Sequence, residues 1–198
     1  MDFPLASTLS GVKSVVLTTI ASSERRRLKV VDISCKKSCS GCCRRYIEIT
    51  VAEASIIVSF LKREKLWDSV KEKAERVSSM VKKVPSNAWF KMDIKCPILD
   101  DNDLCSAYSV RPPVCAVHYA KSNPAVCNPS KVSNQKYDPV EFLEEFTESR
   151  KKLSSTLAGY GVLQIVLPLP TALLMADRIS IKTGLSYDQV MSIIQNEI

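Results

Sequence analysis

The chain has 198 residues, of which 45% are hydrophobic and 25% are charged, and its formal net charge is +7. This length and composition predict a single folded domain over residues 1–198 with an ordinary apolar core, and they exclude a largely disordered protein. No apolar run reaches the ~18 residues that a membrane span requires, so we expect no membrane insertion.

Helical patterns dominate the chain, and we expect a mainly α fold with little β structure. A helix is predicted over residues 11–27, and the alternating residues 46–50 predict a short strand. Thr50 and Glu53 then form a capping-box pattern that begins a second helix.

A third helix is predicted after Asp68, which can cap it, and Pro85 ends it. Its apolar stripe consists of Val70, Ala74, Val77, Met80 and Val81. Residues 85–137 are interrupted by prolines and carry no long periodic segment. We therefore expect irregular structure there, which a bound metal would organise.

The C-terminal part, residues 138–198, is predicted to be helical. Asp138 and Pro139 form a strong helix-start signal, and that helix is expected to end at two nearby glycines. Two further helices are predicted, one over residues 171–181 and one after Ser186.

Cysteines are the most informative residues of the chain. All eight fall within a cysteine-cluster region, residues 33–127: Cys35, Cys39, Cys42, Cys43, Cys96, Cys105, Cys115 and Cys127. Thiolates are soft ligands that select zinc, copper(I) or iron–sulfur clusters. The eight cysteines are therefore our candidate metal ligands.

The first four cysteines form a dense block. Spacings of two to four residues, as in Cys35-x3-Cys39-x2-Cys42, let side chains of one turn converge on a metal, and Gly41 is expected to permit the bend. The adjacent Cys42 and Cys43 are expected to point in different directions. One of them would then bind a second metal or serve as a packing or redox thiol.

The expected cellular compartment and the net positive charge decide between disulfides and metal-bound thiols and bear on nucleic acid as a partner. A secretory signal carries positive charge before its apolar segment, whereas residues 1–9 hold only Asp2 as a charged side chain. We expect a cytoplasmic protein with reduced or metal-bound thiols rather than a disulfide framework. The positive charge admits nucleic acid as a partner only weakly, because basic residues are spread along the chain and alternate with Glu over residues 71–76.

The cysteines stand in four ordered segments: Cys35 to Cys43, Cys96-Pro97-Ile98-Leu99, Leu104-Cys105-Ser106-Ala107-Tyr108 and Arg111-Pro112-Pro113-Val114-Cys115. Together they resemble the YkgJ-type cysteine-cluster family, described as a zinc- or iron-chelating domain. Some members add a further cysteine downstream, where Cys127 stands. The resemblance implies metal binding and no particular activity. One branch, the flagellin lysine methylases, is associated with an iron–sulfur cluster and S-adenosylmethionine, which makes a metal-dependent modifying enzyme one hypothesis.

Two metals remain open. The wide spacing of the last four cysteines favours an iron–sulfur cluster, whereas eight thiols could also form closed zinc sites in a structural module that recruits a protein or nucleic-acid partner. Radical S-adenosylmethionine enzymes share the three-cysteine spacing of the block. Gly41 stands where those enzymes usually carry an aromatic residue, and the strand–helix repeats of their barrel are lacking, so this reading is disfavoured.

The sequence identifies no catalytic residue, and whether the protein is an enzyme stays open. His118 is the single histidine, and a metal ligand, a proton carrier or a packing residue are all compatible with its position. Arg111 is expected to donate to a thiolate or a loop carbonyl, and residues 100–103 are expected to form a turn.

Overall fold

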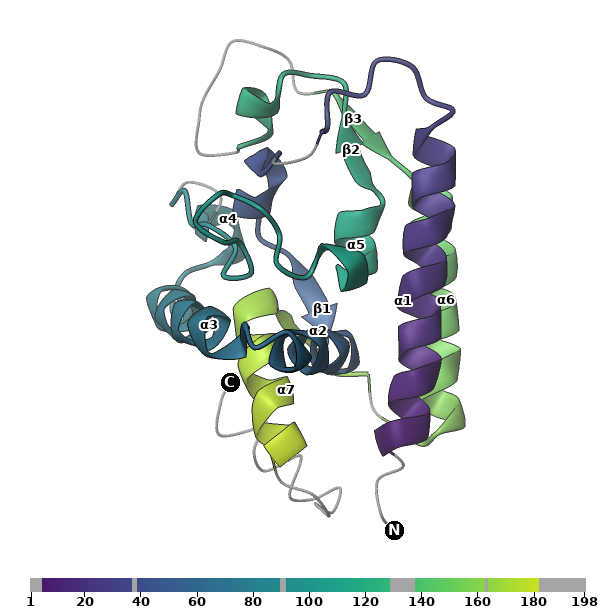
Figure 1. Cartoon of the computed structure of the whole chain (residues 1–198), viewed down its shortest axis with the longest axis vertical. Coiled ribbons are helices and arrows are strands. Elements are labelled where there is room, and N and C mark those ends of the chain that lie inside the picture. Colours follow the sequence, from purple (N-terminus) through teal and green to yellow (C-terminus); the bar gives the residue numbers. More distant parts are fainter. Residues whose placement is uncertain (1–4, 37–38, 90–91, 129–137, 163, 182–198) are drawn as a thin grey trace.

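The computed structural model describes residues 5–36, 39–89, 92–128, 138–162 and 164–181. The protein is mainly α-helical, as predicted (Figure 1). Its five longer helices are α1 (Leu5–Arg27), α2 (Val51–Arg63), α3 (Trp67–Val81), α6 (Leu143–Gly159) and α7 (Leu169–Ile181). Across these described ranges, no helix combines the length and apolar character needed to cross a membrane.

Short elements connect the long helices. Single turns are η1 (Gly41–Arg44), α4 (Ser86–Trp89), η2 (Tyr108–Val110), α5 (Pro113–Ala116) and η3 (Pro124–Cys127). The strands form two antiparallel ribbons, β1 (Glu48–Thr50) with β4 (Val166–Pro168) and β2 (His118–Ala120) with β3 (Pro139–Glu141). The small β content agrees with the prediction.

The long helices share one apolar core. Helices α1 and α6 lie side by side, and α2 packs against α7, α3 and α1 (Figure 1). Side chains from four of these helices are at most 1% exposed in this core: Val12, Val16, Ile57, Leu61, Leu153, Leu157 and Leu173. Burial of such side chains is the main source of stability for a fold of this size.

The predicted capping box at the start of α2 is confirmed. The Thr50 hydroxyl accepts from the Glu53 backbone N–H at 3.1 Å, and the Glu53 carboxylate accepts from the Thr50 N–H at 2.7 Å. The two partners are three residues apart, so the capping box forms from local contacts at the point where β1 ends and α2 begins.

Helix α3 begins two residues earlier than predicted, and Asp68 does not cap it. The N-cap position is Leu66, and Trp67 is the first helical residue, 5% exposed in the core. The earlier start of α3 places the large Trp67 side chain in the core. Four of the five predicted stripe residues are buried, whereas Met80 is 52% exposed.

The predicted helix start at Asp138 is wrong. Residues 139–141 form β3, which pairs with β2, and α6 begins only at Leu143. The preceding Phe142 is buried against Val117 and Tyr119, and its N–H donates to the Val117 carbonyl at 3.0 Å. Strand pairing and aromatic burial, both distant in sequence, override the local signal. The helix predicted after Ser186 lies outside the described residues.

Candidate metal centre

The cysteines lie on short turns beside the helices rather than within them. Cys42 and Cys43 lie in η1, Cys115 lies in α5 and Cys127 ends η3. In Figure 1 the segments around α5, β2 and β3 lie beside α1, whereas α4 lies on the side away from α1. Each of the eight cysteines belongs to the described part of the chain, and each is a free thiol rather than half of a disulfide.

Backbone contacts join the separate cysteine segments. The Cys96 N–H donates to the Cys43 carbonyl at 2.8 Å, which brings the second segment against the first block. Cys105 forms an isolated antiparallel bridge with Leu99, so the chain returns on itself between Cys96 and Cys105. These contacts place cysteines that are more than fifty residues apart in one neighbourhood.

The predicted turn between Cys96 and Cys105 is confirmed. An Asp100 carboxylate oxygen accepts from the N–H groups of Asn102 and Leu104, at 2.9 and 2.8 Å. An aspartate that bonds to backbone groups two and four residues ahead stabilises a turn and leaves that oxygen engaged. Asp100 therefore has a structural role.

Gly41 is required for close packing, which differs from the role we predicted. A Cβ atom at this position would lie 2.4 Å from the Pro124 carbonyl oxygen and 3.0 Å from the Cys127 Cβ. A hydrogen in place of a side chain lets η1 lie directly against η3. Gly41 thus brings Cys127 beside the first block.

Two pairs of thiols in the first block shift each other's pKa. Interaction with Cys35 lowers the pKa of Cys39 to about 6, and the same interaction raises the pKa of Cys35. Interaction with Cys43 lowers the pKa of Cys42 and raises that of Cys43. That Cys42 and Cys43 point in different directions stays a prediction.

Four thiols from four different segments influence one another in every pairing. We call them the inner thiols: Cys42, Cys96, Cys105 and Cys115. Burial is the largest cause that raises the pKa of the last three, that of Cys96 to about 12, and a Cys42 thiolate raises each of them further. Cys105 also raises the pKa of Cys96 and Cys115, and Cys96 raises that of Cys115. Buried thiols of this kind stay protonated at neutral pH unless a positive charge replaces the proton.

Cys127 lies near two cysteines of the first block. Burial raises its pKa most, and the thiolates of Cys42 and Cys39 raise it further. Cys42 is therefore the inner thiol that also influences cysteines outside the inner set.

The thiols are neighbours without forming a closed ligand shell. Within the described ranges, no three Cys, His, Asp or Glu side chains lie close enough together to hold one metal ion. The donor set is soft and half-buried, as zinc and iron–sulfur clusters require. Ligation of a single metal ion would require the cysteine side chains to rotate toward one another. An iron–sulfur cluster is larger and would span more of the distance between their sulfur atoms.

His118 follows Cys115 by three residues and lies on the β2–β3 ribbon. It is half-buried in β2, with Glu141 as its register partner on β3.

Basic side chains compensate for charge near the inner thiols. Lys73 of α3 donates to the Leu99 carbonyl at 2.6 Å and lowers the pKa of Cys96 against the larger effect of burial. Arg111 acts in the same sense on Cys105 and Cys115. The sequence analysis identified Arg111 but not Lys73. Lys73 lies on α3 and reaches the loop between Cys96 and Cys105 from outside that loop.

One aspartate that sequence reasoning missed joins two cysteine segments. Asp93 accepts from the Arg44 guanidinium at 3.0 Å and from the Asn128 amide at 2.7 Å. Arg44 follows the first block, and the buried Asn128 follows Cys127. Asp93 therefore links the ends of η1 and η3.

The partners of Arg111 extend beyond the prediction. Its guanidinium donates to the Tyr108 carbonyl at 3.0 Å, which confirms the expected loop contact, and it also binds Glu24 of α1 at 2.6 Å. Glu24 lies 87 residues away in sequence, and no local pattern pointed to it.

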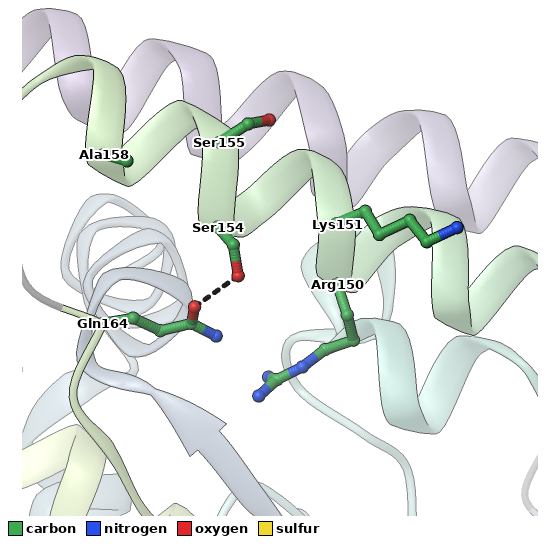
Figure 2. Close-up of a pocket in the computed structure, with 6 residues that line it drawn as sticks. All are labelled: Arg150, Lys151, Ser154, Ser155, Ala158 and Gln164. Atoms are coloured by element: carbon green, nitrogen blue, oxygen red, sulfur yellow. Dashed lines mark hydrogen bonds between the residues drawn. The ribbon is translucent and has the colours of Figure 1, made fainter.

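A separate hollow of about 620 Å³ lies along α6, and Figure 2 shows its lining. The lining residues are Arg150, Lys151, Ser154, Ser155, Ala158 and Gln164. Ser154 donates to the Gln164 carbonyl oxygen (Figure 2). The lining contains no thiol, so this hollow is distinct from the candidate metal centre.

Comparison with known proteins assigns the cysteine region to a family. Residues 34–146 match the sequence profile of a family described as "CxxCxxCC: Putative zinc- or iron-chelating domain". No curated protein and no solved structure matches the chain. The matched range covers more than half of the chain and all eight cysteines, and it supports metal binding. The chain belongs to the CxxCxxCC family of zinc- or iron-chelating domains.

Proposed function

We propose that the protein binds an iron–sulfur cluster through the inner thiols Cys42, Cys96, Cys105 and Cys115. The observation that carries the proposal is the mutual influence of these four thiols, which come from four segments of the chain. Cysteine thiolates from separate loops are the usual ligands of such clusters. The other four cysteines, Cys35, Cys39, Cys43 and Cys127, complete the proposed metal-binding set as a second site or as reserve thiols.

The separation of the thiols favours a cluster over a single ion. A zinc–sulfur bond is about 2.3 Å long, so the sulfur ligands of one zinc ion lie within about 4 Å of each other. Within the described ranges no three donors approach that closely, although the inner thiols influence one another electrostatically. A group with several iron and sulfide atoms spans a wider gap between its ligands.

A structural zinc-binding module is the second candidate. The pairs Cys35/Cys39 and Cys42/Cys43 favour it, because the two thiols of each pair shift each other's pKa and zinc takes ligands from such closely spaced cysteines. Such a module would act by presenting a surface to a protein or, given the net charge of +7, to a nucleic-acid partner.

A modifying enzyme that uses S-adenosylmethionine is a narrower form of the first proposal. It would require that only three of the four inner thiols bind the cluster and leave one iron with an exchangeable ligand, whereas four thiolates around one zinc leave no open position. Reduced thiols suit a cytoplasmic location, which is part of the proposal.

The deciding experiment is anaerobic purification followed by iron, sulfide and zinc analysis and a visible spectrum of one sample. Iron with equimolar sulfide and a brown band near ~400 nm would support the cluster, and S-adenosylmethionine binding should then be measured. A colourless protein with stoichiometric zinc would support the structural module. Freshly purified protein that contains neither metal, and takes up neither after reduction of its thiols, would refute both.

Two cysteine variants test the division of the thiols. Cys96→Ser is expected to lose the cluster, because it removes an inner thiol. Cys127→Ser is expected to retain it, because Cys127 is not one of the four inner thiols. Equal loss of iron in both variants would contradict the proposed division.

A further inference from the structure

Helix α1 reaches the candidate metal centre although it precedes the matched family region. Its residues end at Arg27, whereas the match begins at residue 34. The last two turns of α1 carry Glu24 and Arg27, and both side chains contact cysteine-bearing segments. The family region therefore has a structural partner outside its own boundaries.

The first contact runs through Arg111. A Glu24 carboxylate oxygen lies 2.6 Å from the Arg111 Nη2, and the Arg111 side chain is only 7% exposed. The same guanidinium donates to the Tyr108 carbonyl at 3.0 Å and lies 3.9 Å from the centre of the Tyr108 ring. The Tyr108 hydroxyl donates to Glu24 at 3.3 Å. Tyr108 and Arg111 thus form one unit with Glu24, between Cys105 and Cys115 in sequence.

The second contact runs through Arg27. Its Nη2 donates to the Cys35 carbonyl at 2.8 Å, and its guanidinium lies 5.7 Å from the centre of the Tyr119 ring. Its Nη1 lies 3.9 Å from the second carboxylate oxygen of Glu24. One carboxylate therefore faces two arginines, each of which holds a different cysteine segment.

This arrangement constrains the distance between the two segments. Arginine binds carboxylates with fixed, planar geometry, and a nearly buried guanidinium that loses its carboxylate is left uncompensated. Removing the Glu24 charge would free Arg111 to move and would release the loop that carries Cys105 and Cys115. A metal that draws ligands from several loops depends on such outer contacts for its affinity.

We propose that Glu24 is a positioning residue of the metal centre, which holds the Cys35 segment and the Cys105–Cys115 segment in register through Arg27 and Arg111. The inference rests on the proposed function, since it concerns the site that would bind the metal. It adds that the cysteine region requires an acidic residue from the preceding helix.

The test compares Glu24→Gln with Glu24→Asp and with a matched control, Glu64→Gln. Glu64 also pairs with an arginine, Arg63 at 3.0 Å, but on the exposed end of α2. Metal affinity is measured by chelator competition with the metal found in the wild type, together with the visible spectrum and the thermal midpoint of the loaded and metal-free forms. Glu24→Gln is expected to bind at least ten-fold more weakly with a shifted ligand-to-metal absorption band. Glu24→Asp should recover part of the affinity, and Glu64→Gln should match the wild type.

A purely structural role for Glu24 gives a different result. If Glu24→Gln lowers the thermal midpoint equally in both forms and leaves affinity and spectrum unchanged, the proposal is overturned. Should that variant fail to fold, Tyr108→Phe removes only the hydroxyl bond to Glu24. A two- to three-fold loss of affinity in Tyr108→Phe would support the proposal, and wild-type affinity would overturn it. A wild type that binds no metal would instead refute the proposed function, and the inference with it.

Discussion

The helical frame and the cysteine region are stabilised in different ways. The helical frame, α1, α2, α3, α6 and α7, buries a continuous apolar core. The cysteine region adds Ile98, Ala107 and Val110 to that core and forms two smaller apolar clusters, one around Trp89 and one around Tyr119. It also depends on contacts such as Asp93 with Asn128 and Lys73 with Leu99. Apolar burial is non-directional, whereas these contacts each require one partner in one place. Changes in the two regions should therefore have separable effects, on stability for the frame and on metal binding for the cysteine region.

The largest effect is expected from Cys42→Ser. Cys42 influences the other inner thiols and Cys43, so its loss removes the residue that joins the two groups of cysteines. We expect loss of metal binding, measured by elemental analysis. The variant should also lack the large stability that bound metal gives to the wild type, whereas the metal-free forms of the two proteins should be equally stable. Structural zinc contributes on the order of 10 kcal/mol in small domains, which sets the scale.

His118→Ala is the control for that experiment. The inner thiols supply four ligands without His118, which lies in the β2–β3 ribbon, so the metal content of His118→Ala should equal that of the wild type. Metal retained at full stoichiometry in Cys42→Ser, or lost in His118→Ala, would contradict the proposed ligand set.

Leu173→Ala should have the largest effect on the helical frame. Leu173 lies on α7, is 0% exposed and packs in the core shared with α2. Truncation of a buried leucine costs about 2–5 kcal/mol, which denaturant unfolding of the metal-free protein would measure. Leu143→Ala is the control, because Leu143 is 61% exposed at the start of α6 and should change stability little. If Leu173→Ala instead lost metal at unchanged stability, the frame and the cysteine region would not be separable.

The same division explains what could be predicted from the sequence. The capping box of Thr50 and Glu53 and the periodic helices were found because their partners lie within a few residues. The helix start at Asp138 was wrong because its strand partner, β2, lies about twenty residues earlier in the chain. Local signals are reliable only where local contacts decide the structure.

For the candidate site, the residue type was predictable and the arrangement was not. The eight cysteines identified the metal chemistry, and the family match covers them all. Glu24 could not be found, because it meets Arg111 only after the chain has folded across 87 positions. The link that Asp93 makes between Arg44 and Asn128 was also missed, since its partners lie 49 and 35 residues away in sequence.

Gly41→Ala tests a contact within the cysteine region. The added methyl would lie 2.4 Å from the Pro124 carbonyl oxygen, so η1 and η3 must separate. Overpacking of this kind costs about 1–3 kcal/mol, and we expect weaker metal binding as well because the inner thiol Cys42 moves with η1. Gly159→Ala is the matched control, since a methyl there meets no atom within 4 Å. Equal stability and metal affinity in the two variants would show that the close approach of η1 and η3 is not needed.

The smallest effect concerns a charge in the helical frame. Burial is the main cause that raises the pKa of Glu53, against the opposing hydrogen bonds from Thr50 and the charge of Arg150. A carboxyl group whose pKa is raised by folding stabilises the protein most at pH values below its pKa in the unfolded chain. That contribution is lost as the pH rises through its pKa in the folded protein. Glu53→Gln retains an oxygen for the Thr50 N–H and cannot ionise. Relative to the wild type it should therefore become more stable as the pH rises from 4 to 8, measured by denaturant unfolding across that range. Glu72→Gln, on the exposed face of α3, should show no such trend. A difference between Glu53→Gln and the wild type that is constant with pH would mean that the buried carboxylate carries no charge penalty, and that the capping bonds alone account for its place in the core.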